Sequence, residues 1–297
     1  MRVAFFGLPL AALLLQRDGH ELVLVASCRR VALGNRRAAR VFGDAFVVRP
    51  RVDTALVSRL RAARPDVVVS WFWTTRLPRE VRDAAPHGAI GVHPSLLPRH
   101  RGPDPYFWAI DAGDTVTGVT AHRLDDEYDT GAVLGARRLA IDPGWTAWRL
   151  ARALDRPSLA LLRETVAALA AGAAPPELAQ DDAAATSAPE PEGALLGLHP
   201  SDDVEACLRR VRALAPVPGA SIELGEHALA ITRAERADVP RALEPGEIAV
   251  VDGRAILRVR DGGLWLRGAT RLSGGEEVEL SEGQIAALVQ AGGCNDA

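Results

Sequence analysis

Short apolar runs recur along the first half of the chain, each followed by a polar or helix-patterned stretch. The runs hold four to six mostly apolar residues, and segments such as Thr54–Ala63 between them have helical spacing. This alternation is typical of parallel strands joined by crossover helices. The sequence therefore predicts an α/β domain with a mostly parallel sheet, with strands at Val3–Phe6, Leu22–Ala26, Ala45–Val48, Val67–Phe72, Ala89–Val92 and Val119–Leu124.

The pattern changes in the second half of the chain. A long Ala/Leu/Arg helix is predicted over Thr146–Ala170, with Pro157 marking a kink or a break. Ala171–Gly193 is rich in Ala, Pro, Asp and Glu without periodicity, which is typical of a linker. After an amphipathic helix at Asp203–Ala213, turn signals separate several short strands and predict a small β-barrel, with strands at Ser221–Leu224, Ala228–Ala234, Glu247–Val251, Ala255–Arg260, Gly263–Gly268 and Glu277–Leu280.

Composition and charge support a division into parts. We expect a catalytic domain over 1–180, a linker over 181–200 and a C-terminal domain over 201–297. The net charge of −3 is unevenly spread, because residues 196–297 carry −5, residues 181–195 carry −4 and residues 1–180 carry about +6. All basic residues are Arg. An acidic C-terminal half argues against a nucleic-acid surface there.

The chain has no feature that we expect to cross a membrane or to form a disulfide framework. The apolar run Leu8–Leu15 is too short to span a bilayer and no basic segment precedes it. Cys28, Cys207 and Cys294 are widely spread and form no C-x-x-C pair. This usage argues against structural zinc and favours a reducing, cytoplasmic compartment.

One candidate chemical group stands at the end of a predicted strand. His93 closes the strand Ala89–Val92, and the proline after it ends strand pairing. Ligands of open α/β sheets bind outside the carboxyl ends of the strands, so this imidazole is expected to face a ligand crevice. Ser95 is placed either to fix the ring or to bind substrate. Asp104 then precedes a predicted helix at Tyr106–Ile110 and is a suitable N-cap.

A second candidate group follows the next strand. Residues 125–129 hold four acidic side chains directly after the apolar strand Val119–Leu124. A carboxylate beside an imidazole orients the ring and raises its basicity for proton transfer. We therefore expect His93 to pair with Asp129.

These motifs resemble a known family. His-Pro-Ser-Leu-Leu-Pro at 93–98, followed by Asp-Thr-Gly at 129–131, is similar to the formyltransferases that use N10-formyltetrahydrofolate. Arg99–Gly102, Gly118–Thr120, Leu77-Pro78 and the stretches 212–214 and 216–220 match as well. The resemblance covers nearly the whole chain, and its best overall match is the methionyl-tRNA formyltransferase type.

The resemblance implies a Rossmann-like catalytic domain, an OB-like C-terminal barrel and formyl transfer to an amine without a metal. His93 and Asp129 would move protons through the tetrahedral intermediate. The pterin ring of the folate would lie between the loops Trp71–Leu77 and Asp125–Asp129, held largely by backbone groups. The implied folate-binding residues are Trp71, Arg76, Leu77, Asp125, Asp126, Glu127 and Tyr128, and the implied substrate residues are Ser95, Arg99 and Tyr106.

The sequence departs from the family two residues before the histidine. The family has an asparagine there, which steadies the formyl oxygen, and this chain has Gly91. Loss of one preorganised oxyanion donor typically costs on the order of 10²–10³ in rate. Either a water, a backbone amide or Arg99 takes over, or the chain catalyses a changed acyl transfer. A third alternative is a non-catalytic protein that binds folate or serves only as an interaction protein. Glu127, where tRNA enzymes usually have glycine, indicates a differently shaped loop.

The acceptor amine is left open between two classes. An initiator tRNA would need a basic footprint, and the Arg-rich segment Arg29–Arg40 is explained equally by a solvated helix face. Tyr106, Phe107 and Trp108 stand where the tRNA enzymes have small residues, and are explained by a substrate pocket or by helix core packing. The sequence favours a small or carrier-bound amine over methionyl-tRNA.

Overall fold

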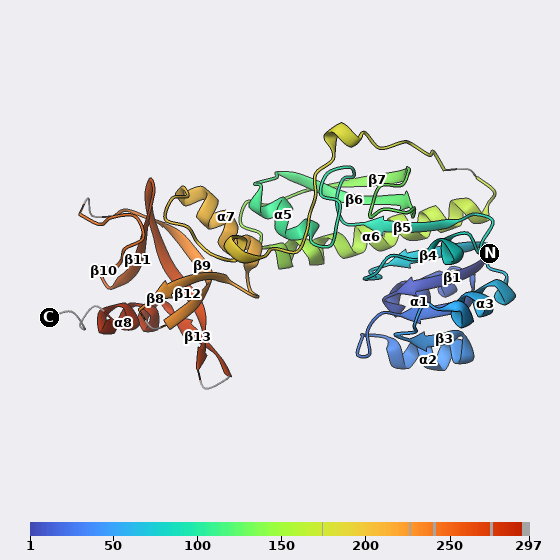
Figure 1. Cartoon of the computed structure of the whole chain (residues 1–297), viewed down its shortest axis with the longest axis horizontal. Coiled ribbons are helices and arrows are strands. Elements are labelled where there is room, and N and C mark those ends of the chain that lie inside the picture. The colour runs from blue at the N-terminus through green and yellow to red at the C-terminus, as the bar shows by residue number, and fades with distance from the viewer. Residues whose placement is uncertain (174, 226, 240–241, 274–275, 293–297) are drawn as a thin grey trace. The chain divides into compact units, whose positions relative to one another are not determined.

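The computed structural model describes residues 1–173, 175–225, 227–239, 242–273 and 276–292, and shows two compact units (Figure 1). The first comprises residues 1–105, 116–140 and 153–189. The second comprises 106–115, 141–152 and the described residues from 190 onward. Segments 106–115 and 141–152, which the sequence assigns to the catalytic part, thus group with the second unit.

The first unit is built on a mixed sheet, which in its described residues has the strand order β3-β2-β1-β4-β5-β6-β7. Neighbours from β3 to β5 are parallel, whereas β5–β6 and β6–β7 are antiparallel. The strands are β1 (Arg2–Gly7), β2 (Glu21–Ser27), β3 (Phe46–Val48), β4 (Val67–Trp71), β5 (Ala89–His93), β6 (Val116–Arg123) and β7 (Val133–Ala140). The expected mostly parallel, Rossmann-like sheet is confirmed.

The prediction that Val119–Leu124 forms a parallel strand is wrong. The strand β6 runs antiparallel to β5, with Thr120 opposite His93 and His122 opposite Gly91. A parallel strand would require the chain to cross back to the end of the sheet where β5 begins before it enters β6. Here the chain reaches β6 through the short helix α5 (Pro105–Asp111) and enters the strand at the edge where β5 ends.

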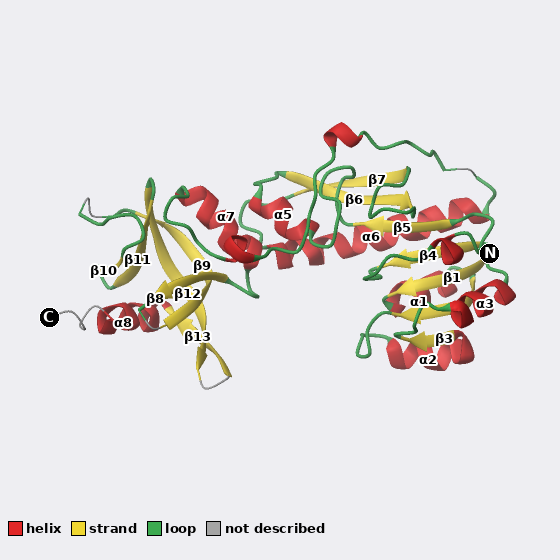
Figure 2. Ribbon diagram, viewed as in Figure 1, coloured by secondary structure: helices red, strands yellow, loops and turns green. Residues whose placement is uncertain are grey.

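Helices cover both faces of this sheet (Figures 1 and 2). The helices α3 (Thr54–Ala63) and α4 (Arg79–Arg82) bury Leu60 and Val81 against Val68 and Ala89. Side chains alternate along a strand, so Trp71 points to the opposite face from Val68. There its indole Nε1 donates to the Ser158 hydroxyl of α6 at 2.8 Å. The other helices of this part are α1 (Pro9–Arg17), α2 (Asn35–Phe42) and α6 (Ala147–Ala170).

The helix α6 is continuous through Pro157. The predicted break between two helices at Pro157 is therefore absent. Helix interiors tolerate proline when packing outweighs the lost backbone hydrogen bond. Leu154 and Leu161 on either side of Pro157 are 1% and 7% exposed, so burial of this face holds the helix together.

The second unit contains an antiparallel sheet whose described strands run in the order β10-β11-β12-β9-β8, with β13 paired to β12. All the short strands predicted beyond residue 220 are present. They are β8 (Ala220–Leu224), β9 (His227–Ala237), β10 (Ile248–Val251), β11 (Arg254–Val259), β12 (Gly262–Ser273) and β13 (Glu276–Ser281), flanked by the helices α7 (Val204–Leu214) and α8 (Glu282–Gly292). Asp203 caps α7 by accepting from the Ala206 amide at 2.7 Å.

Among the described helices none combines the length and apolarity needed to cross a membrane. Cys28 and Cys207 are free thiols, and burial raises the pKa of Cys207 to about 11. Cys294 lies outside the described residues.

Candidate active site

The strand β5 ends on a buried histidine. The His93 ring, 6% exposed, has its Nε2 at 2.8 Å from the carbonyl oxygen of His100 and its Nδ1 at 3.3 Å from Oδ2 of Asp129. A carbonyl and a carboxylate both accept hydrogen bonds, so the ring donates to both when it is the imidazolium. The structure thus brings together the two residues that the sequence pairs.

Asp129 is held through both its side chain and its main chain. Its Oδ2 accepts from the Gly102 amide at 2.9 Å, and its main-chain carbonyl accepts from the Gln180 side chain at 2.8 Å. Asp129 has φ 59°, a left-handed conformation that Asp and Asn adopt more readily than most residues. Gly102 has φ 124°, and a Cβ there would lie 2.8 Å from the Ala188 carbonyl oxygen. Only glycine therefore fits where this amide meets the carboxylate.

Ser95 fastens its own loop rather than the His93 ring. It is fully buried, and its hydroxyl donates to the Arg99 carbonyl at 2.6 Å. Thr120 of β6 donates to the Ser95 carbonyl at 2.7 Å and accepts from the Leu97 amide at 3.1 Å. These bonds fix the loop after His93 to β6. Arg99 is exposed, and the partly buried Tyr106 lies in α5 of the second unit.

A third polar group, His122, stands beside the pair and was not singled out from the sequence. It lies opposite Gly91 in the β5–β6 register and is 2% exposed. Its Nε2 is 3.5 Å from Oδ1 of Asp129, and its Nδ1 is 2.8 Å from the Arg123 carbonyl. A Cβ at Gly91 would lie 3.6 Å from that Nε2, so the ring fills the space beside the glycine. A buried histidine within an apolar strand was the signal available in the sequence.

Burial lowers the pKa of the His122 imidazole from its ordinary value of 6.5, and the nearby Asp129 carboxylate opposes this effect only in part. The neutral ring then carries its hydrogen on Nδ1, which faces a carbonyl that can only accept. The Nε2 atom beside Asp129 is accordingly the unprotonated nitrogen. His122 and His93 thus differ in their surroundings while sharing one carboxylate.

This burial predicts a pH-dependent stability. Because the folded-state pKa of His122 lies below the unfolded value, the unfolded chain binds more protons as the pH drops below about 6.5. Stability is therefore fully present above that pH and is lost as the pH falls toward the folded pKa. The melting temperature should decrease between pH 7 and 5.5, with a shallower slope in His122→Gln. An equal slope in that variant would contradict the assignment, and His20, also buried with a lowered pKa, accounts for the residual slope.

The two loops expected to hold the pterin ring lie against each other. The Arg76 guanidinium donates to the Asp126 carbonyl at 2.6 Å and stands over the Tyr128 ring, with 5.8 Å from its central carbon to the ring centroid. Arg82 pairs with the Asp126 carboxylate. Asp125 accepts from the Thr130 hydroxyl at 2.7 Å.

The remaining predicted folate residues differ in exposure. Glu127 and Tyr128 are exposed. Trp71 and Leu77 are 3% and 6% exposed, so their side chains belong to the core and only their backbone groups remain for a ligand.

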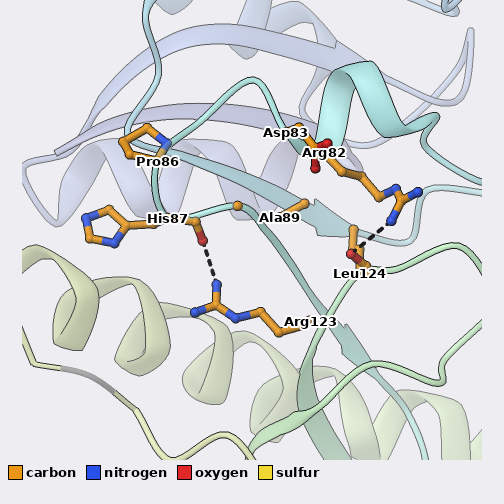
Figure 3. Close-up of a pocket in the computed structure, with 8 residues that line it drawn as sticks. Arg82, Asp83, Pro86, His87, Ala89, Arg123 and Leu124 are labelled. Atoms are coloured by element: carbon orange, nitrogen blue, oxygen red, sulfur yellow. Dashed lines mark hydrogen bonds between the residues drawn. The ribbon is translucent and has the colours of Figure 1, made fainter.

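A cavity of about 310 Å³ opens at the start of β5 and the end of β6, lined by Arg82, Asp83, the segment 86–89, Arg123 and Leu124 (Figure 3). Arg123 donates to the His87 carbonyl across it, and Arg82 donates to the Leu124 carbonyl at 3.5 Å. Leu124 lines the cavity, and its Cδ2 would lie 2.9 Å from a Cβ at Gly91. This volume is at the lower end of small-molecule sites. The described residues contain no group of three or more His, Cys, Asp or Glu side chains placed to hold a metal ion.

The structure thus combines a buried His–Asp pair, which is suited to proton transfer, with a mostly parallel sheet. The family model for formyl transferases matches residues 16–166, about half of the chain, and the chain belongs to this family. The predicted class of enzyme, a formyltransferase, is thereby confirmed. Formyltransferases use N10-formyltetrahydrofolate, as the sequence motifs implied.

Individual relatives narrow the comparison. The chain is 36% identical over 282 residues to a methionyl-tRNA formyltransferase of Anaeromyxobacter dehalogenans, covering 89% of each chain. Among solved structures it is similar to HypX from Aquifex aeolicus in complex with tetrahydrofolic acid, at a TM-score of 0.64 and 21% identity, covering 96% of this chain and 46% of HypX. It is also similar to WlaRD, a sugar 3N-formyl transferase, at a TM-score of 0.67 and 13% identity, covering 92% and 98%. These two structural likenesses support the fold.

Proposed function

We propose that this protein transfers the formyl group of N10-formyltetrahydrofolate to an amine that is small or carrier-bound. The observation that carries the proposal is the buried His93–Asp129 pair, with the carboxylate fixed by the Gly102 amide. Formyl transfer removes a proton from the attacking amine and returns one to the donor nitrogen. A carboxylate held against an imidazole is suited to both steps.

The donor is proposed to bind beside the centre. The loops that contain Arg76 and Asp126 lie against each other there. We place the pterin ring at these loops and the formyl carbon beside the His93–Asp129 pair. The substrate-binding roles of Ser95, Arg99 and Tyr106 remain predictions, and so do the folate-binding roles of Trp71, Arg76, Leu77, Asp125, Asp126, Glu127 and Tyr128.

The preference for a small amine rests on charge. Residues 181–297 carry a net negative charge, whereas tRNA binding requires neutralised phosphates. The second unit's antiparallel sheet is proposed to be an OB-like barrel, a fold that by itself does not decide between ligands. The sequence favours a cytoplasmic setting for the reaction.

Methionyl-tRNA is the second candidate acceptor. The observation in its favour is the 36% identity to a methionyl-tRNA formyltransferase across 89% of both chains. The test is tetrahydrofolate release from N10-formyltetrahydrofolate with a panel of nucleotide-linked amino sugars, amino acids and charged initiator tRNA. We expect turnover with a small amine and no tRNA binding at low salt. Salt-dependent tRNA binding with formylation of the methionyl group would overturn the choice of acceptor, and no turnover with any amine would overturn formyl transfer.

A further inference from the structure

The centre contains a polar group that formyl transfer by one His–Asp pair leaves unused. Ala89, Gly91 and His93 alternate onto one face of β5, and the residue opposite Gly91 on β6 points to the same face. That residue is His122. With no side chain at 91, its ring reaches within 3.5 Å of the Asp129 carboxylate, on the oxygen that His93 does not face. One carboxylate therefore lies between two imidazoles.

Accessibility separates the roles of these groups. The Asp129 side chain is 17% exposed, against 7% for His93 and 3% for His122. An incoming amine therefore meets the carboxylate first, and His122 can act only through it.

The hydrogen bonds of the two rings set them in different states. His93 lies between a carbonyl and a carboxylate, both acceptors, which suits a ring that holds a proton on each nitrogen. The Nδ1–H of His122 donates to the Arg123 carbonyl, which leaves Nε2 with a free electron pair. Pairs of titratable groups held in different environments typically divide acid and base work between them.

We propose that His122 is a positioning residue that takes up, through Asp129, the proton that the attacking amine loses. This inference rests on the formyl transfer proposed above. This role explains how the site can work with glycine at 91, because the polar group beside the Asp129 carboxylate is His122 of β6 and not a side chain at position 91 of β5.

The proton balance closes within the three residues. The amine nitrogen forms its bond to the formyl carbon, the carbonyl π pair moves to oxygen, and the N–H proton passes to Asp129 and on to Nε2 of His122. The electron pair on oxygen then re-forms the carbonyl, the bond from carbon to the donor nitrogen breaks with its electron pair going to that nitrogen, and His93 supplies the proton that the nitrogen takes up. Return of a proton from His122 across Asp129 to His93 restores the starting state. No other reactant is needed.

The charged groups facing His122 set its titration. Burial, which has the largest effect, and the neighbouring His93 oppose the protonated ring, whereas Asp129 and, more weakly, the Arg123 carbonyl and Asp125 favour it. The His122 ring is thus neutral in the resting site. The imidazolium formed during the reaction is stabilised by the carboxylate that delivers the proton.

The test compares His122→Gln with His20→Gln, which makes the same change at a buried histidine outside the site. The donor is N10-formyltetrahydrofolate and the acceptor is whichever amine of the panel turns over. General base catalysis typically contributes 10²–10⁴-fold, so we expect kcat to fall about 100-fold in His122→Gln with KM changed less than about threefold. The acid limb of the kcat–pH profile should disappear in this variant and persist in His20→Gln. An unchanged kcat and acid limb in His122→Gln would overturn the proposal.

A second measurement needs no turnover and is independent of the proposed reaction. Imidazole NMR titration of the unaltered chain follows His122 directly. Asp129→Asn should lower the His122 pKa further, because the carboxylate that favours its charged form is gone, and His93→Gln should raise it. A His122 titration indifferent to both variants would disprove the shared carboxylate. If the wild type transfers no formyl group, the proposed function fails. The titration still shows whether the pKa of His122 depends on Asp129 and His93.

Discussion

Replacing Asp129 by Asn should lower kcat by about 10³–10⁴ while leaving the fold intact. The carboxamide retains the shape of the side chain and an oxygen to accept the Gly102 amide, which donates at 2.9 Å in the wild type. It removes the negative charge that faces both His93 and His122. Asn is the suitable substitution because the residue has φ 59°, and Ala would add backbone strain to the loss of charge.

The matched control for this prediction is Asp125→Asn in the same loop. Asp125 accepts from Thr130 and from the Glu127 amide and pairs with no imidazole nitrogen in the described structure. Its variant should lose much less kcat than Asp129→Asn, because the charge at 129 stays in place, and a change in the KM for the folate would report the folate-binding role predicted for Asp125. Steady-state assays of tetrahydrofolate release, together with thermal unfolding, measure both effects. Comparable losses in the two variants would mean that loop shape, not the charge at 129, limits the reaction.

Locally encoded elements were predictable from the sequence. The helix α3 coincides with the predicted Thr54–Ala63, because its cap is local: Asp53 accepts from the Leu56 amide at 3.0 Å. The pairing of His93 with Asp129 was predicted from the chemistry of a carboxylate beside an imidazole. Because the antiparallel β6 ends next to the start of β5, strand order alone would not have placed Asp129 beside His93. The strand β7 was missed because Arg137 and Arg138 interrupt its apolar pattern on an exposed edge of the sheet.

Features that depend on register and on backbone contacts were not predictable. His122 matters because it lies opposite Gly91, and strand register cannot be deduced from one apolar run. The stretch around 180–188 has the composition of a linker, yet Gln180 donates to the carbonyls of Asp129 and Gly131, and Ala188 donates to Arg101. Such main-chain partners leave no trace in composition.

Restoring the family's asparagine in Gly91→Asn should reduce activity instead of raising it. The first side-chain atom at 91 would lie 2.9 Å from Leu124 Cδ2 and 3.6 Å from His122 Nε2, and the rest of an asparagine would enter the space of the His122 ring. Overpacking of a filled site forces neighbouring side chains off their rotamers. Displacing His122 from Asp129 should lower kcat about 10- to 100-fold, as removal of an acid–base partner does.

A double-mutant cycle tests this steric exchange. In Gly91→Asn combined with His122→Ala the asparagine gains the volume that the imidazole leaves, so the double variant should lose less activity than the product of the two single losses. Gly91→Ala adds one carbon, which would lie 2.9 Å from Leu124 Cδ2 and 3.6 Å from His122 Nε2, so it measures how much of the loss comes from this first contact alone. Independent, multiplicative losses would mean that the two positions do not share one space. A gain of turnover in Gly91→Asn alone would mean that the wild-type centre lacks a working third group, in conflict with the role assigned to His122.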